Sequence, residues 1–257
     1  MNLIVEGIKY QLHAKKRQGI HSPFIYDLVD NGLTSKVSNE HKTILKAFDL
    51  TQQRDTRVIH ITDLGAGSRK LSNQRTIRDI QRISSSGKRY GRLLYLLCQH
   101  YKPLHILELG TSLGRGTLAM HLGHPEAQIT TIEGATEIAE IAKENIKKFS
   151  LTPNSIEIVS SSFATYLNAL PTQSFDLIYI DGHHESEALF TYLEKLMNFS
   201  HEQTVFIVDD IRWNNDMYEA WNKLIKDPRF HVSIDFFRMG MLSHRKSQAK
   251  EHFTLSF

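Results

Sequence analysis

The sequence is poor in cysteine and tryptophan, and its charge is almost balanced. It has one cysteine, Cys98, in 257 residues, so no disulfide can form within the chain, and a reducing compartment is expected. The net charge of +3 falls well short of the basic footprint that nucleic-acid binding requires. We therefore expect a cytoplasmic protein without a nucleic-acid partner.

Long apolar runs are also missing. No stretch approaches the roughly 18 apolar residues of a membrane-spanning helix, and the first residues lack the apolar core of a signal peptide. We expect no membrane partner. With 40% apolar and 23% charged residues, the composition is that of an ordinary globular protein. The length suits one large α/β domain with an appendage, or two small domains.

What the sequence does contain is an apolar strand followed by a glycine-rich turn. Residues 104–109 predict a buried strand, and Gly110, Gly114 and Gly116 lead into a predicted helix at 117–122. Glycines let the backbone approach a ligand closely, and the first amides of a helix lack partners. The pattern is typical of a nucleotide-like ligand site in a doubly wound sheet. Alone, it also fits a plain turn between strand and helix.

A second predicted strand at 127–133 favours the ligand site. It ends in Glu133 and Gly134, followed by an amphipathic helix at 137–149. A carboxylate at this place can accept hydrogen bonds from both ribose hydroxyls of a nucleotide-like cofactor. The alternative is a solvated glutamate at a strand end.

An earlier segment imitates this pattern. Residues 58–67 also combine an apolar strand, Asp63 and the sequence Leu-Gly-Ala-Gly. A basic and polar stretch follows, without a second apolar strand ending in an acid. We interpret the segment as a local turn, since only the later loop satisfies the whole context.

Strands and helices then alternate to the end of the chain, which predicts an α/β fold with a doubly wound, mostly parallel sheet. Residues 1–83 are expected to form a mainly helical cap or lid, and 84–257 the ligand-binding domain. Residues 84–91 are expected to be a polar break before the next helix. Ser22 and Pro23 predict a helix start. The other expected strands lie at 155–159, 175–181 and 204–210, with a terminal hairpin at 231–244 and a candidate edge strand at 252–257.

Acidic residues end the two later strands of this predicted core. Asp181 follows one strand, and Asp209 and Asp210 follow the next. Together with Glu108 and Glu133 they would crowd one sheet edge, which is unfavourable unless a cation or hydrogen-bond donors neutralise them. Three carboxylates suit a hard cation such as Mg²⁺. The alternative is that they cap loops or face solvent.

Two histidines directly follow this group in the sequence. His183 and His184 lie close to Asp181, and a histidine at such a place can act as a general base near neutral pH. The chain has 14 histidines, so an ordinary structural role is the alternative.

Taken together, these motifs resemble the class I S-adenosylmethionine-dependent methyltransferases, most closely the catechol and caffeoyl-coenzyme A type of small-molecule O-methyltransferase. The resemblance covers about residues 84–244. Residues 209–214 resemble the family's Asp-Asn-x-x-Trp-Asn run, with Asp210 in place of asparagine, and His184 falls on the catalytic lysine. The resemblance implies a Rossmann-like methyltransferase sheet of seven strands with a terminal antiparallel hairpin.

The resemblance also implies roles for individual residues. The catalytic residues would be His184, His183 and Asp181, and the Mg²⁺ ligands Asp181, Asp209 and Asp210. Residues that would bind S-adenosyl-L-methionine are Glu108, Gly110, Thr111, Ser112, Gly114, Glu133, Gly134, Ser162, Phe163, Asp181 and Tyr90.

The expected reaction is methyl transfer to a hydroxyl of a small molecule, first a phenolic or catechol-like acceptor and second a sugar. Phe24, Tyr26, Tyr90 and Trp213 are candidate walls of the acceptor site or ordinary packing residues. The alternatives are a metal-independent or non-catalytic S-adenosylmethionine-binding protein and a nicotinamide-dependent oxidoreductase. A second copy of the chain, forming a homodimer, is also left open.

Overall fold

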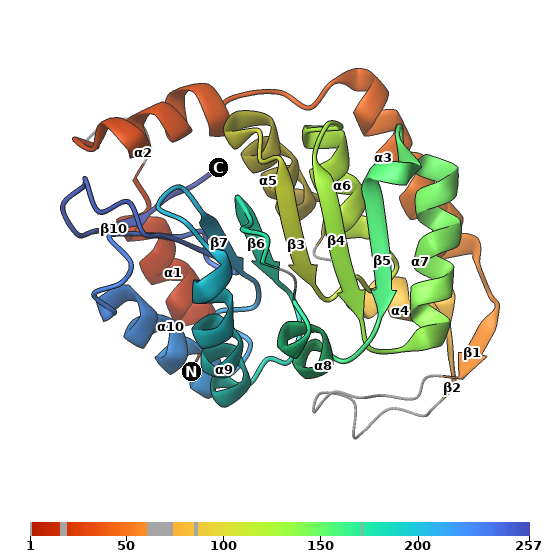
Figure 1. The fold of residues 1–257 in the computed structure, drawn as a ribbon. Helices are drawn as coiled ribbons and strands as arrows, with labels where there is room; N and C mark the ends of the chain where they lie inside the picture. The colour runs from red at the N-terminus through yellow and green to blue at the C-terminus, as the bar shows by residue number, and fades with distance from the viewer. Residues whose placement is uncertain (1, 16–19, 61–73, 85–86, 171) are drawn as a thin grey trace. The chain divides into compact units, whose positions relative to one another are not determined.

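The computed structural model describes residues 2–15, 20–60, 74–84, 87–170 and 172–257. Its residues form two compact units, one made of Met1–Thr34 with Pro171–Phe257 and the other of Ser35–Leu170 (Figure 1). The imitating motif from Asp63 to Gly67 lies outside the described residues. Among the residues described, no helix has the length and apolar character needed to cross a bilayer.

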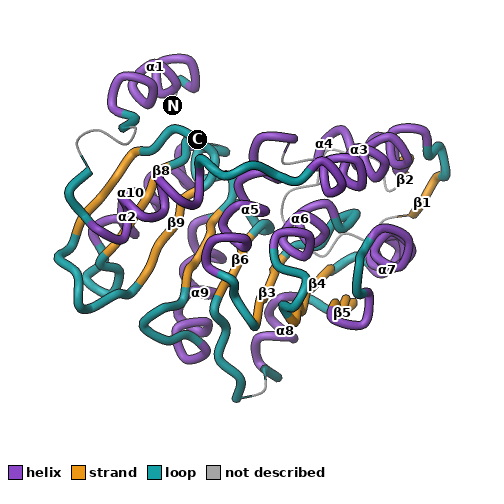
Figure 2. Tube along the Cα trace, turned by 90° about the horizontal axis from the view of Figure 1, so that it is seen from above, coloured by secondary structure: helices purple, strands orange, loops and turns teal. Residues whose placement is uncertain are grey.

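The unit of residues 35–170 is built around three parallel strands. Strand β3 pairs with β4, and β4 pairs with β5. Figure 2 shows α6 and α8 on opposite faces of these strands, which is the doubly wound arrangement. Its elements are α3 (Asn39–Arg54), β1 (Val58–His60), β2 (Gln74–Thr76), α4 (Ile77–Ser84), α5 (Gly87–Tyr101), β3 (His105–Leu109), α6 (Arg115–Gly123), β4 (Gln128–Glu133), α7 (Thr136–Phe149), β5 (Ile156–Ser160) and α8 (Phe163–Asn168).

The other unit holds five strands in the order β10-β8-β9-β7-β6. Strands β6 and β7 are parallel, whereas β9 runs antiparallel to both β7 and β8. Its elements are α1 (Leu3–His13), α2 (Pro23–Asp27) with a π-helix at Leu28–Leu33, β6 (Leu177–Ile180), α9 (Ser186–Leu196), β7 (Val205–Val208), α10 (Asn215–Lys226), β8 (Val232–Asp235), β9 (Gly240–Ser243) and β10 (Glu251–Thr254).

Among the described residues, three of these strands (β3, β4 and β5) belong to residues 35–170 and five to the other unit, so the expected count of seven is wrong. The additional strand is β10 in the tail, which pairs in parallel with β8. The mostly parallel sheet, the terminal hairpin of β8 and β9 and the helices near the N-terminus are confirmed.

The break expected at residues 84–91 is also wrong in part, because α5 already begins at Gly87. Lys88 and Arg89 in its first turn are exposed, so a polar sequence there is compatible with a helix surface. The predicted start of α2 is confirmed: Pro23 is its first residue and the Ser22 hydroxyl accepts a hydrogen bond from the amide of Ile25.

Candidate functional site

The glycine-rich turn after β3 is a tight loop attached to the neighbouring strand. Gly110 and Gly114 have φ angles of 109° and 87°, in the left-handed region that favours glycine. The amides of Gly110 and Thr111 both donate to the carbonyl of Ile132 in β4, at 3.0 and 3.2 Å. Gly114 then caps the N-terminus of α6. The first amides of a helix have no intrahelical acceptor, so the loop ends at a group of potential donors at the start of α6.

Glu133 stands at the end of β4 and braces this loop. One carboxylate oxygen accepts a hydrogen bond from the amide of Ser112 at 2.9 Å, and the other accepts one from the amide of Ala135 at 3.0 Å. A carboxylate offers about four acceptor sites. Glu133 is half-buried, so its carboxylate lies at the surface of the unit beside the loop.

Glu108 lies inside the unit rather than at the open end of the sheet. It belongs to β3, is 1% exposed, and one carboxylate oxygen accepts hydrogen bonds from the hydroxyls of Thr117 and Thr131. Burial raises the pKa of Glu108 to about 7, although the two hydroxyls oppose that rise. The observed contacts fit a residue that joins β3, β4 and α6 beneath the loop.

The other residues expected at the cofactor site have more varied positions. Gly134 lies in the bend after β4, and Tyr90 is half-buried in α5. Ser162 caps α8 by accepting a hydrogen bond from the amide of Thr165, and Phe163 is the buried first residue of that helix.

Sequence reasoning missed Asn145, a buried residue of α7. Its amide nitrogen donates to the carbonyl of Leu113 in the glycine-rich loop at 2.9 Å, and its oxygen accepts from Gln52 of α3 at 2.7 Å. Similarly, Asp49 of α3 forms an ion pair with Arg115 at the start of α6. A local motif gives no signal for these contacts, because each joins residues far apart in the sequence.

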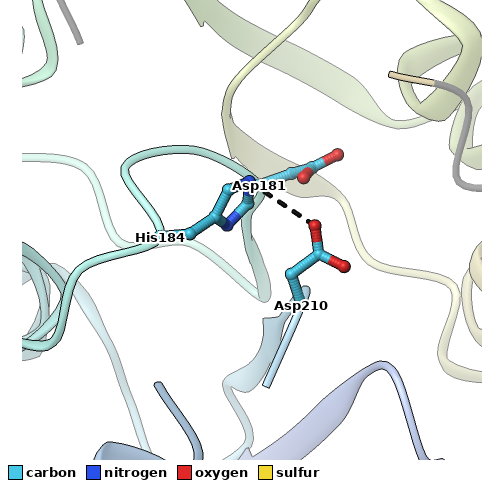
Figure 3. A group of neighbouring side chains, drawn as sticks. All are labelled: Asp181, His184 and Asp210. Carbon is cyan, nitrogen blue, oxygen red and sulfur yellow. Dashed lines mark ion pairs between the residues drawn. The ribbon is translucent and has the colours of Figure 1, made fainter. Parts of the chain in front are cut away.

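The second group of expected site residues follows β6 and β7. Asp181, His184 and Asp210 each have a ligand atom within 4.8 Å of those of the other two, and Figure 3 shows their side chains gathered together. The Nε2 atom of His184 lies 3.5 Å from a carboxylate oxygen of Asp210. Asp210 has a φ angle of 52°, an uncommon conformation for a residue other than glycine.

The electrostatics of this cluster are set mainly by burial. Burial raises the pKa of Asp181 well above its usual value, and the charges of Asp209 and Asp210 add to that rise. Burial and Asp209 likewise raise the pKa of Asp210 to about 7. Burial lowers the pKa of His184, which favours a neutral imidazole that can accept a proton.

The two adjacent histidines face different partners. His183 has a φ angle of 51°, and its Nδ1 forms a hydrogen bond with the hydroxyl of Tyr192 in α9. Its ring also stacks on that of Tyr192. His184 instead lies beside Asp210 and next to the ring of Trp213, with 5.5 Å between ring centroids. Of the two histidines, His184 is therefore the one that lies beside Asp210.

Asp209 does not join the cluster as expected. It is buried at 1% exposure, and both of its oxygens accept hydrogen bonds from the guanidinium of Arg238, a residue that sequence reasoning also missed. Burial alone would lower the pKa of Arg238, but the charges of Asp209 and Asp210 raise it above its usual range. The expected set of Asp181, Asp209 and Asp210 therefore fits a metal ion poorly.

Comparison with known proteins agrees with the fold and with the motifs. A family model described as a methyltransferase domain matches residues 107–211. An O-methyltransferase of Aspergillus hancockii is 33% identical over 119 residues, which are 44% of this chain and 46% of that protein. A catechol O-methyltransferase of Niastella koreensis is 28% identical over 125 residues, 47% of this chain and 55% of that protein. The chain thus spans about half the length of these curated relatives.

Solved structures extend the likeness of the fold to most of the chain. The structure of the O-methyltransferase from Bacillus cereus in complex with S-adenosylhomocysteine has a TM-score of 0.55 at 18% identity, covering 86% of this chain and 97% of that one. The expected resemblance to S-adenosylmethionine-dependent O-methyltransferases is therefore confirmed as a similarity, with residues 107–211 matching the model of a methyltransferase domain.

Proposed function

We propose that this protein is an enzyme that transfers a methyl group from S-adenosylmethionine to a hydroxyl of a small molecule. The observation that carries the proposal is the glycine-rich loop together with Glu133 at the end of β4, whose carboxylate accepts a hydrogen bond from the amide of Ser112 in that loop. The relatives named as O-methyltransferases support the same reaction class.

The residues near the loop fit the cofactor by their chemistry. Glu133 supplies acceptors, and the first amides of α6 supply donors for the negatively charged carboxylate of a methionine group. Asn145 and Asp49 keep the loop and α6 in place through Leu113 and Arg115. When bound, S-adenosylmethionine would supply an electrophilic methyl group on a sulfonium centre.

His184 is the proposed general base. A neutral imidazole can accept the proton of an acceptor hydroxyl, and Asp210 at 3.5 Å would stabilise the imidazolium that forms. Asp181 completes the cluster and would hold the hydroxyl by hydrogen bonding. Methyl transfer cancels charge between the two reactants, so orientation of the hydroxyl should supply much of the rate.

A phenolic acceptor is proposed before a sugar. The ring of Trp213 is 62% exposed and lies next to His184, so a flat aromatic acceptor could pack against it. Phe24, another expected wall residue, is already covered by the guanidinium of Arg245, 3.8 Å above its ring.

Mg²⁺ was expected at Asp181, Asp209 and Asp210. Because Arg238 contacts Asp209 and Asp210, the proposed reaction includes no step that depends on a metal ion.

The test is a methyl-transfer assay with a panel of catechols, simple phenols and sugars, with detection of S-adenosylhomocysteine and of the methylated product. We expect turnover with at least one hydroxyl acceptor, and a loss of about a hundredfold or more in His184→Asn. His183→Asn is the matched control, since asparagine tolerates the positive φ angle there, and it should keep most of the activity. Binding of S-adenosylmethionine without turnover of any acceptor would favour a non-catalytic binding protein.

A further inference from the structure

Arg238 occupies the place that a metal ion would need. It lies in the short connection between β8 and β9, and its Nε atom is 3.0 Å from Asp209 and 2.9 Å from Asp210. A second guanidinium nitrogen is 3.3 Å from the other oxygen of Asp209. Two of the three carboxylates expected to bind Mg²⁺ are therefore already paired with a cation of the chain.

The carboxylate of Asp209 has no capacity left for a metal ion. One oxygen accepts from Arg238 and from the amide of Asp210 at 2.7 Å. The other accepts from Arg238 and from the hydroxyl of Tyr179 at 2.9 Å. Four donors fill about four acceptor sites of a carboxylate. A metal ion could reach Asp209 only by displacing a charge-assisted hydrogen bond inside the protein.

The backbone that carries Arg238 is fixed by several contacts. The buried guanidinium of Arg212 donates to Asp235 at the end of β8 and to the carbonyl of Phe237. The amide of Phe237, whose φ angle is 76°, donates back to Asp235. The carbonyl of Arg238 itself accepts from the amide of Ile211 at 2.9 Å. The position of the guanidinium therefore follows from the fold and not from a freely rotating surface side chain.

Arg238 also contacts the group of Asp181, His184 and Asp210, through the carboxylate of Asp210. A metal ion bound by Asp181, His184 and Asp210 would share Asp210 with Arg238, whose Nε is already 2.9 Å from that carboxylate. Two cations so close together repel each other strongly in a half-buried site, where the effective dielectric constant is low.

We propose that Arg238 takes the place of a divalent cation by holding Asp209 and Asp210, so that hydroxyl methylation by this protein proceeds without a bound metal. The inference rests on the proposed function and narrows it. Arg238 is a positioning residue: it acts through the two aspartates, which in turn position His184 and the acceptor hydroxyl.

The first experiment measures metal binding and metal dependence of the unaltered full chain. Mn²⁺, a paramagnetic probe for Mg²⁺ sites, is titrated and its free fraction is followed by electron paramagnetic resonance. We expect no stoichiometric binding up to millimolar Mn²⁺ and no loss of methyl transfer on addition of EDTA. Stoichiometric Mn²⁺ binding that disappears in Asp181→Ala, or activity that is lost with EDTA and restored by Mg²⁺, would overturn the inference.

The second experiment removes the internal cation. Arg238→Gln leaves Asp209 and Asp210 without their guanidinium and should bind Mn²⁺ at least about tenfold more tightly than the unaltered protein. Arg238→Lys keeps the positive charge and should bind Mn²⁺ as weakly as the unaltered protein.

Arg229→Gln is the matched control, because Arg229 also pairs with two carboxylates, Asp227 and Glu194, and is similarly exposed at 33% against 28% for Arg238. It should leave Mn²⁺ binding unchanged. If a folded Arg238→Gln binds Mn²⁺ no better than the control, the inference is wrong. If Arg238→Gln does not fold, two measurements still test the inference. They are the effect of EDTA on methyl transfer by the unaltered protein and the binding of Mn²⁺ by Arg238→Lys.

Failure of this inference can be told apart from failure of the proposed function. Binding of S-adenosylmethionine is measured by calorimetry on the same samples. Tight binding of both S-adenosylmethionine and Mn²⁺ would reject only the role of Arg238, whereas absence of cofactor binding would reject the methyltransferase proposal itself.

Discussion

Two regions of the molecule hold acids at the ends of parallel strands, and they satisfy these acids in different ways. In residues 35–170, Glu108 and Glu133 accept hydrogen bonds from neutral donors, namely threonine hydroxyls and backbone amides. In the other unit, Asp209 and Asp210 are paired with the guanidinium of Arg238. The comparison shows that an acid after a strand does not by itself define a metal site. The donors that the rest of the chain brings to it decide its chemistry.

The largest change in stability is expected from breaking the ion pair that holds the backbone carrying Arg238. Arg212 and Asp235 form a buried ion pair at 2.6 Å, and removal of one partner leaves an uncompensated buried charge. Arg212→Met should lower the free energy of unfolding by about 3–5 kcal/mol. Urea denaturation checks this.

The double variant Arg212→Met/Asp235→Leu separates charge from packing. It replaces both charges by apolar side chains and should recover a large part of the loss. If the second substitution lowers the free energy of unfolding by as much again as Arg212→Met did, the ion-pair explanation is incorrect.

The next largest change in stability concerns Glu108, in residues 35–170, and depends on pH. The pKa of Glu108 is raised from 4.5 to about 7, so the folded state holds this proton more tightly than the unfolded state. The stabilisation from that proton is complete below about pH 4.5 and is lost as pH rises through about 7, at a cost of at most about 3 kcal/mol. Glu108→Gln carries no such ionisation and should gain stability relative to the unaltered protein as pH rises.

Urea denaturation at about pH 5 and about pH 8 measures this difference. The control is Glu157→Gln, at an exposed position of the neighbouring strand β5. A difference between Glu108→Gln and the unaltered protein that is the same at both pH values would contradict the buried state of Glu108.

The smallest of these effects tests the bracing of the glycine-rich loop. Asn145→Ala removes one donor to Leu113 and one acceptor for Gln52, and unsatisfied buried groups cost about 1–3 kcal/mol. The variant should also bind S-adenosylmethionine more weakly, as measured by calorimetry.

Asn222→Ala provides the comparison, since the side-chain amide of Asn222 donates to the carbonyl of Tyr218 within α10, away from the glycine-rich loop. Equal cofactor affinity in the two variants would show that Asn145 has no part in shaping the loop.

The sequence predicted the elements that depend on local patterns. The amphipathic helix expected at 137–149 is α7 at Thr136–Phe149, and the strand expected at 127–133 is β4 at Gln128–Glu133. These succeeded because the spacing of apolar residues directly reflects which face is buried. The strand β10 was only a candidate, because pairing in parallel with β8 depends on a distant partner.

The partners of the candidate site residues were beyond the reach of such patterns. Asp209 and Arg238 are 29 residues apart, and Gln52 and Asn145 are 93 residues apart. The sequence therefore placed carboxylates near the strand ends without showing which donors would meet them. That is why Asp209 was expected to bind a metal ion and instead contacts a guanidinium.

We propose that Glu133 and the glycine-rich loop bind the cofactor, and that Asp181, His184 and Asp210 act on the acceptor hydroxyl. The most direct test is calorimetric titration of the unaltered protein, Glu133→Ala and Asp210→Asn with S-adenosylmethionine. We predict micromolar binding that is weakened at least about tenfold in Glu133→Ala and retained in Asp210→Asn. Absence of binding by the unaltered protein, or equal loss in both variants, would contradict the account.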